Sequence, residues 1–127
     1  MERRNFLVLD DEPAITALIK RVAEGCGYNV VTISQPEDIR QHLKTMRTDV
    51  IGLDLAMPTM DGIEILRLLA DERSQAQILI ISGFDRRILE TALRLGEALG
   101  LNVVGTISKP LQIDKLRNLL GQLGDPF

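Results

Sequence analysis

Five short apolar runs, each followed by a segment with helical spacing, alternate along this chain. The runs are Phe6–Leu9, Asn29–Ile33, Val50–Asp54, Gln77–Ile81 and Asn102–Ile107. They are too short for helices, and several are rich in β-branched residues, which favours strands. Continuous apolar runs of this kind are typical of strands that are buried on both faces of a parallel sheet.

The intervening segments carry apolar residues three and four positions apart, as on one face of a helix. Their apolar stripes run over Ile15–Cys26, Ile39–Met46, Ile63–Ala70, Ile88–Leu99 and Leu116–Leu123. Gly25 and Gly27 mark the end of the first helix, Gly100 marks the end of the fourth, and Met57–Gly62 is expected to be a loop. Five strand–helix units in strict alternation predict an α/β fold, a doubly wound parallel sheet with helices on both faces.

The length of 127 residues suits a single domain, with residues 5–123 as its core and residues 124–127 as a tail or the start of a linker. The net charge of −3 argues against direct binding of nucleic acid, which requires a concentrated positive face. Cys26 is the single cysteine and cannot form an internal disulfide. With no signal peptide and no membrane-spanning run, the expected location is the cytoplasm, away from the membrane.

Polar side chains that could bind a ligand or take part in a reaction follow four of the five strands. They are Asp10, Asp11, Asp54, Ser82 and Lys109. Because the carboxyl ends of parallel strands meet at one edge of the sheet, where ligands bind in such folds, we expect these side chains to lie close together. Three crowded carboxylates repel one another unless a cation relieves them, and carboxylate oxygens are ligands that Mg²⁺ prefers.

Each residue of this set also has an ordinary explanation. Asp10, Asp11 and the neighbouring Glu12 precede a helix, where carboxylates cap amide groups. Ser82 is followed by glycine as in many turns, and Lys109 could be a solvated loop charge.

Taken together, the residues favour phosphoryl chemistry. A carboxylate can attack phosphorus and form an aspartyl phosphate, while a cation, an ammonium group and a hydroxyl neutralise the phosphoryl oxygens. This chemistry needs no general base, and His42, in the second helix, is interpreted as a surface residue.

The order and spacing of these elements closely resemble the receiver domains of two-component response regulators. The resemblance covers Phe6 to about Leu123. It is carried by the strand into Asp10-Asp11, by Asp54-Leu55-Ala56-Met57-Pro58 with Asp61-Gly62, by Ser82-Gly83 and by Lys109-Pro110. It implies a flavodoxin-like sheet of five strands in the order 2-1-3-4-5 with five helices. It also implies a signalling switch that is not itself an enzyme.

The resemblance also implies the metal site and the phosphoacceptor. Asp54 would accept a phosphoryl group. Asp11 and Asp54 would bind Mg²⁺ directly, Asp10 would bind it largely through water, and Ala56 would bind it through the backbone carbonyl. Lys109 would pair with the phosphoryl oxygens.

Two further roles are implied at the strand exits. Ser82 would move toward the phosphoryl group and report its arrival. The peptide bond between Lys109 and Pro110 would be cis, an isomer that is accessible at modest cost only before proline.

Three departures from the family pattern stand out. Thr106 occupies the switch position where the family usually has Tyr or Phe, three residues before the lysine. Ala56 and Phe84 occupy positions that tune the lifetime of the phosphate, and neither side chain can orient a water by hydrogen bonding. The segment 84–104 is a few residues longer than usual and looks like receivers that precede cyclic-di-GMP phosphodiesterase (EAL) domains.

The function expected from this resemblance is a phosphoacceptor switch. Its phosphoryl donor would be a sensor histidine kinase or a phosphotransfer protein. Its output would be a domain of the same chain or a partner protein, and the apolar stripe Ile88–Leu99 leaves a homodimer open. A receiver-like docking module that accepts no phosphate is the alternative. A phosphohydrolase of the haloacid dehalogenase type is disfavoured, because that class needs an aspartate where this chain has Ala56.

Overall fold

The computed structural model describes residues 3–35, 37–57, 60–83 and 85–124. Its main sheet has five parallel strands: β1 (Arg4–Leu9), β2 (Tyr28–Ile33), β3 (Val50–Asp54), β6 (Gln77–Ser82) and β7 (Asn102–Ser108). Their order across the sheet is β2-β1-β3-β6-β7. This order is the predicted order 2-1-3-4-5 of the five long strands, so the predicted fold class is confirmed.

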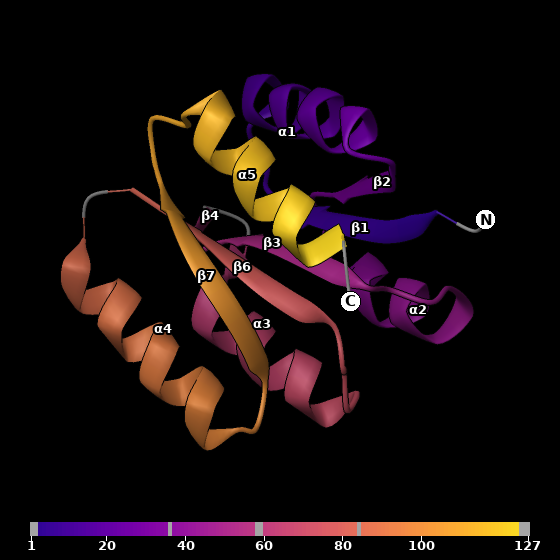
Figure 1. The fold of residues 1–127 in the computed structure, drawn as a ribbon. Coiled ribbons are helices and arrows are strands. Elements are labelled where there is room, and N and C mark those ends of the chain that lie inside the picture. The colour runs from indigo at the N-terminus through magenta and orange to yellow at the C-terminus, as the bar shows by residue number, and fades with distance from the viewer. Residues whose placement is uncertain (1–2, 36, 58–59, 84, 125–127) are drawn as a thin grey trace.

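Helices cover both faces of this sheet (Figure 1). They are α1 (Pro13–Gly25), α2 (Glu37–Thr45), α3 (Gly62–Asp71), α4 (Arg86–Ala98) and α5 (Ile113–Gly124). In Figure 1, α1 and α5 lie on one side of the sheet, and α2, α3 and α4 lie on the other. Among the described residues, no helix combines the length and the apolar character needed to cross a membrane.

The alternation of side chains along the strands divides the core into two layers. In β1, Leu7 and Leu9 belong to the layer under α2, α3 and α4, whereas Phe6 and Val8 belong to the layer under α1 and α5. All four of these side chains are buried. The strands therefore read as continuous apolar runs because each face of the sheet has its own core.

The segment after β3 differs from the prediction. Met57–Gly62 was expected to be a loop, but Ala56–Met57 (β4) pairs antiparallel with Met60–Asp61 (β5). Helix α3 then begins at Gly62, and Asp61 caps it by accepting a hydrogen bond from the backbone amide of Ile63 at 2.9 Å. A side chain at position 62 would meet Leu55 Cα at 2.8 Å, so only glycine allows this close approach.

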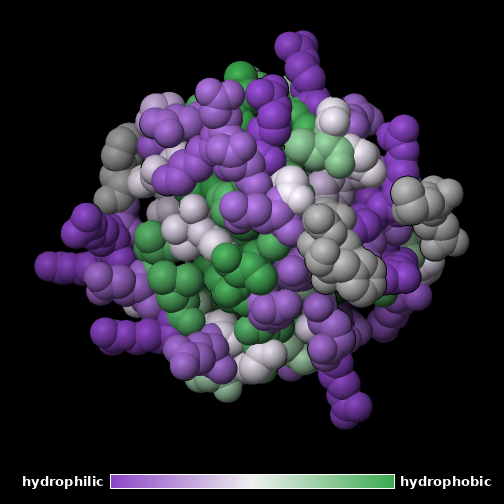
Figure 2. Space-filling view, viewed as in Figure 1, coloured by the Kyte–Doolittle hydropathy of each residue, from purple (hydrophilic) through white to green (hydrophobic). Residues whose placement is uncertain are grey.

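The end of α4 confirms the predicted stop. Gly100 has a φ of +75°, a conformation that glycine adopts without the steric cost of a side chain. Leu89, Leu93 and Leu95 pack against the core, whereas Ile88 is 43% exposed. The space-filling view shows apolar side chains at the surface where β7 lies between α4 and α5 (Figure 2).

Candidate functional site

The carboxyl ends of the strands lie side by side, as expected for a parallel sheet. Leu9 of β1 lies beside Leu53 of β3, and Asp54, the last residue of β3, lies beside Ile81 of β6. Ser82 is the last residue of β6 and lies beside Ser108 at the end of β7. Residues that follow or end four strands are thus brought to one edge of the sheet.

Lys109, directly after β7, is the centre of the ionic contacts at this edge. Its Nζ donates hydrogen bonds to Asp54 Oδ2 at 3.0 Å and to Glu12 Oε1 at 2.8 Å. It also lies 3.5 Å from Asp10 Oδ2. One ammonium group therefore contacts three carboxylates that come from two different strand exits.

Burial makes these charges strongly interdependent. The side chains of Asp10 and Asp54 are 0% and 1% exposed, and that of Lys109 is 16% exposed. Burial alone would lower the pKa of Lys109, but hydrogen bonds to Glu12 and Asp54 outweigh this effect and raise the pKa above its ordinary value. Burial raises the pKa of Asp10, and the nearby charge of Asp54 adds to the rise. Lys109 is thus kept cationic, and Asp10 resists ionisation.

Asp54 is held by the backbone that follows it. Its Oδ1 accepts a hydrogen bond from the amide of Ala56 at 3.0 Å, and the amide of Leu55 donates to the carbonyl of Ile81 at 3.2 Å. These bonds fix the carboxylate where β3 gives way to β4. Both carboxylate oxygens are therefore oriented before any ligand arrives.

The donor set fits a divalent cation. Ligand oxygens of Asp10, Glu12 and Asp54 all lie within 4.8 Å of one another. Asp10 Oδ2 is buried and has no hydrogen-bond partner among the described residues, an arrangement that is costly unless a further charge satisfies it. Oxygen ligands of this kind suit a hard ion such as Mg²⁺, which often binds through one or two carboxylates and the phosphate oxygens of a substrate.

A cavity of about 370 Å³ opens beside these residues. It is lined by Glu12, Asp54, Leu55, Ala56, Ser82, Gly83, Asp85, Ile88 and Lys109. Its walls bring the carboxylate of Asp54, the hydroxyl of Ser82 and the ammonium group of Lys109 to one space. A phosphoryl group on Asp54 would therefore find neutralising partners within the cavity.

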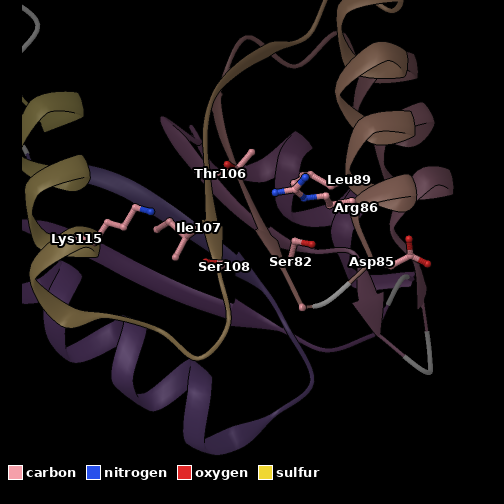
Figure 3. A pocket seen from close by; sticks show the side chains of 9 residues that line it. Ser82, Asp85, Arg86, Leu89, Thr106, Ile107, Ser108 and Lys115 are labelled. Atoms are coloured by element: carbon pink, nitrogen blue, oxygen red, sulfur yellow. The ribbon is translucent and has the colours of Figure 1, made fainter.

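Ser82 also lines a second cavity of about 370 Å³, between α4 and β7. Figure 3 shows Ser82 between Thr106 of β7 and Asp85 at the start of α4. Thr106, which the resemblance predicts to be a switch residue, lines this cavity, and its switch role stays a prediction. Since Ser82 lines both cavities, a movement of its side chain would change the shape of both.

Two acidic residues need separate mention. The Asp11 carboxylate, which the resemblance predicts to bind Mg²⁺ directly, is not a member of the acidic group; it lines a small cavity together with Asp10 and Thr16, and its role as a ligand stays a prediction. Glu12, which the sequence placed at a helix cap, makes no side-chain cap hydrogen bond and contacts Lys109 instead. The sequence held a signal for this, because Glu is not among the residues preferred at the N-cap position of a helix.

The remaining predicted residues have the following places. Ala56 is exposed beside Asp54, and the role of its carbonyl as a metal ligand stays a prediction. The peptide bond between Lys109 and Pro110 is cis, the isomer that the resemblance implied. Phe84 lies outside the described residues. His42 is half-buried in α2, where burial lowers its pKa.

Curated proteins with similar sequences carry related regions. The alkaline phosphatase synthesis transcriptional regulatory protein of Bacillus subtilis is 34% identical over 65% of this chain. A protein-glutamate methylesterase/protein-glutamine glutaminase of Halalkalibacterium halodurans is 36% identical over 94% of it. The matched regions are only 34% and 36% of the lengths of these relatives, so this chain spans about a third of each.

Two solved structures match this chain over nearly the full length of both proteins. A response regulator from Colwellia psychrerythraea matches with a TM-score of 0.82 and 35% identity, covering 97% of this chain and 98% of that one. The signal receiver domain of a response regulator from Bermanella marisrubri matches with a TM-score of 0.83 and 28% identity, covering 98% and 100%. The family model described as the response regulator receiver domain matches residues 6–121. The chain therefore belongs to the response regulator receiver domains, the phosphoacceptor signalling modules of two-component systems.

Proposed function

We propose that Asp54 is the phosphoacceptor of this receiver domain and that its modification switches the domain between two states. The observation that carries the proposal is the hydrogen bond of 3.0 Å from Lys109 Nζ to Asp54 Oδ2 at a buried strand end. Asp54, the proposed nucleophile, and the positive charge of Lys109 both line the same cavity. Phosphoryl transfer depends mainly on such positioning and charge neutralisation.

The proposed reaction transfers a phosphoryl group from the phosphohistidine of a sensor kinase or phosphotransfer protein. A carboxylate oxygen of Asp54 forms a bond to phosphorus, and the bond between phosphorus and the imidazole nitrogen breaks. The electron pair of that broken bond stays with the imidazole. Lys109 stabilises the negative charge that develops on the phosphoryl oxygens.

Mg²⁺ would be held by Asp54 together with Asp10 and Glu12, whose oxygens already lie close together. When bound, it would offset the charge of the phosphoryl oxygens. The backbone carbonyl of Ala56 and the carboxylate of Asp11 remain candidates from the family resemblance.

Ser82 is the proposed reporter of the modification. Its side chain borders both the cavity of Asp54 and the cavity beside Thr106, so a hydrogen bond to the phosphoryl group would draw it toward Asp54. A local charge would thereby bias a two-state element. Without an aromatic ring at position 106, the change would reach α4 through the position of Ser82 and the shape of the cavity.

The proposed output of the switch rests on the sequence of the segment 84–104 and on the exposed surface of α4. A domain of the same chain or a separate partner would read the state of α4 and β7. The segment 84–104 favours a cyclic-di-GMP phosphodiesterase domain, and a full-length sequence with such a domain beside residues 1–127 would support this. Ile88, which is 43% exposed, is available to a second copy of the chain, so a homodimer also stays a prediction.

The direct test uses beryllofluoride, which mimics a phosphoryl group on aspartate. In a ¹⁹F NMR titration with Mg²⁺, the wild-type domain should show a bound signal, and Asp54→Asn should show none. A wild-type protein without a bound signal, or an Asp54→Asn variant that retains it, would refute the proposal. The first outcome would favour a docking module that accepts no phosphate.

A further inference from the structure

We propose that Glu12 competes with the phosphoryl group for Lys109. The Glu12 carboxylate accepts a hydrogen bond from the ammonium group before phosphorylation and releases the ammonium group when Asp54 carries a phosphoryl group. This inference rests on the proposed function, since it concerns the same site. It adds to the site a residue that tunes how readily Asp54 is modified.

The contacts of Lys109 carry the first step. Its shortest ionic contact is the 2.8 Å hydrogen bond to Glu12 Oε1, compared with 3.0 Å to Asp54 Oδ2. A phosphoryl group on Asp54 needs the same ammonium group, because the positive charge of Lys109 is the one described cation that contacts the acidic group. The Glu12 carboxylate and the phosphoryl oxygens therefore compete for one partner.

The local backbone frees Glu12 for this contact. Glu12 stands at the N-cap of α1, yet its side chain makes no hydrogen bond to the first turn. Its own amide donates to Asp10 Oδ1 at 2.9 Å, which anchors the backbone beside the site. The carboxylate is thus free to contact Lys109 while the main chain stays in place.

Burial decides which carboxylate yields. The side chain of Glu12 is 58% exposed, whereas those of Asp10 and Asp54 are 0% and 1% exposed. Glu12 can turn from Lys109 toward water or a bound cation without leaving a buried charge unpaired, and neither aspartate can do so. A phosphoryl group would also repel the Glu12 carboxylate, so this side chain is the one that moves.

The test compares Glu12→Gln, which keeps the shape of the side chain and removes its charge, with Glu24→Gln on the exposed C-terminal part of α1. The affinity for beryllofluoride is measured by ¹⁹F NMR at saturating Mg²⁺, after the Mg²⁺ affinity of each variant has been determined separately. Saturation removes the contribution that Glu12 makes to cation binding. Glu12→Gln should bind beryllofluoride about two- to fivefold more tightly, the range expected for one partly exposed ion pair.

Glu24→Gln should bind like the wild type, and the gain in Glu12→Gln should shrink in high salt. An unchanged or weaker affinity of Glu12→Gln at saturating Mg²⁺ would overturn the proposed competition, even though the wild type binds. A wild-type protein that binds no beryllofluoride overturns the proposed function itself, together with the competition.

The contact between Glu12 and Lys109 has a second readout that needs no phosphoryl analogue. Competitive acetylation followed by mass spectrometry measures the reactivity of Lys109 relative to Lys20 and Lys115, which are exposed. Lys109 should react faster in Glu12→Gln than in the wild type or in Glu24→Gln. Equal reactivity of Lys109 in all three proteins would show that Glu12 does not hold it, and the inference would be wrong.

Discussion

Asp54 Oδ2 accepts a hydrogen bond from Lys109 Nζ at 3.0 Å, although the two residues are 55 positions apart in the sequence. The contact exists because β6 lies between β3 and β7 in the sheet, so the exits of β3 and β7 face the same cavity. Both side chains are largely buried. Removal of one would therefore leave the other as a buried charge without a partner, which lowers the stability of the fold.

Replacement of Lys109 by methionine should therefore destabilise the domain. The variant keeps the apolar stem but leaves Asp10 and Asp54 without their nearest positive charge. The free energy of unfolding, measured in urea without Mg²⁺, should fall by about 1–3 kcal/mol. Lys20→Met, at an exposed position of α1, should leave it nearly unchanged. Equal losses in both variants would mean that the ionic contacts do not stabilise the fold.

Asp10→Asn should have the opposite effect on the metal-free domain. Burial raises the pKa of Asp10, so its ionised form costs stability at neutral pH, and this cost disappears as the pH falls through the folded-state pKa toward the ordinary value of 3.8. The variant should melt at a higher temperature than the wild type at pH 7.5, with a difference that shrinks on acidification.

The same substitution should weaken stabilisation by Mg²⁺, because a ligand that binds only the folded state raises its stability by mass action. Glu24→Gln provides the comparison, since Glu24 is exposed on α1 and is not a member of the acidic group. A metal-free Asp10→Asn domain that melts below the wild type at pH 7.5 would argue against the repulsion inferred for Asp10 and Asp54.

Gly62→Ala tests the backbone that supports Asp54. A Cβ at this position would meet Leu55 Cα at 2.8 Å, so the start of α3 must shift away from the strand exit. The expected loss is about 1–3 kcal/mol in the free energy of unfolding. Gly121→Ala in α5 is the matched control, because its Cβ would meet nothing within 4 Å and alanine favours the helix. The close contact would be disproved by a stable Gly62→Ala.

Ser82→Ala separates binding from folding. No hydrogen bond of the Ser82 hydroxyl is found among the described residues, so its loss should change the free energy of unfolding by less than about 1 kcal/mol. Affinity for beryllofluoride should fall about tenfold, as expected when a hydrogen bond to a charged group is removed. Ser82→Thr, which keeps the hydroxyl, should retain most of the affinity. Wild-type affinity in Ser82→Ala would remove Ser82 from the proposed switch.

The fold could be predicted from the sequence because both faces of the sheet are buried. Strands such as Val50–Asp54 therefore contain little but apolar residues up to the exit, and the five runs mark the sheet directly. The two-residue strands β4 and β5 could not be predicted, since two residues carry no periodicity. Their pairing depends on the antiparallel contact of Ala56 with Asp61, which only the folded chain shows.

The candidate site was predicted less completely than the fold. Asp54, Asp10, Ser82 and Lys109 were found because each stands at a strand exit, a position that the topology brings to one edge. The sequence favoured Asp11 as the metal ligand and gave Glu12 only a capping role, because it does not show which way two adjacent side chains turn. In the structure the Glu12 carboxylate turns to Lys109, and the Asp11 carboxylate lies outside the group.

The most direct test of the account is the covalent modification of Asp54. The domain is incubated with acetyl phosphate and Mg²⁺, and its intact mass is measured before peptide mapping locates the modified residue. The account predicts a gain of one phosphoryl group on Asp54 in the wild type, and no gain in Asp54→Asn or without Mg²⁺. A gain that persists in Asp54→Asn, or a wild-type protein that gains nothing, would contradict it.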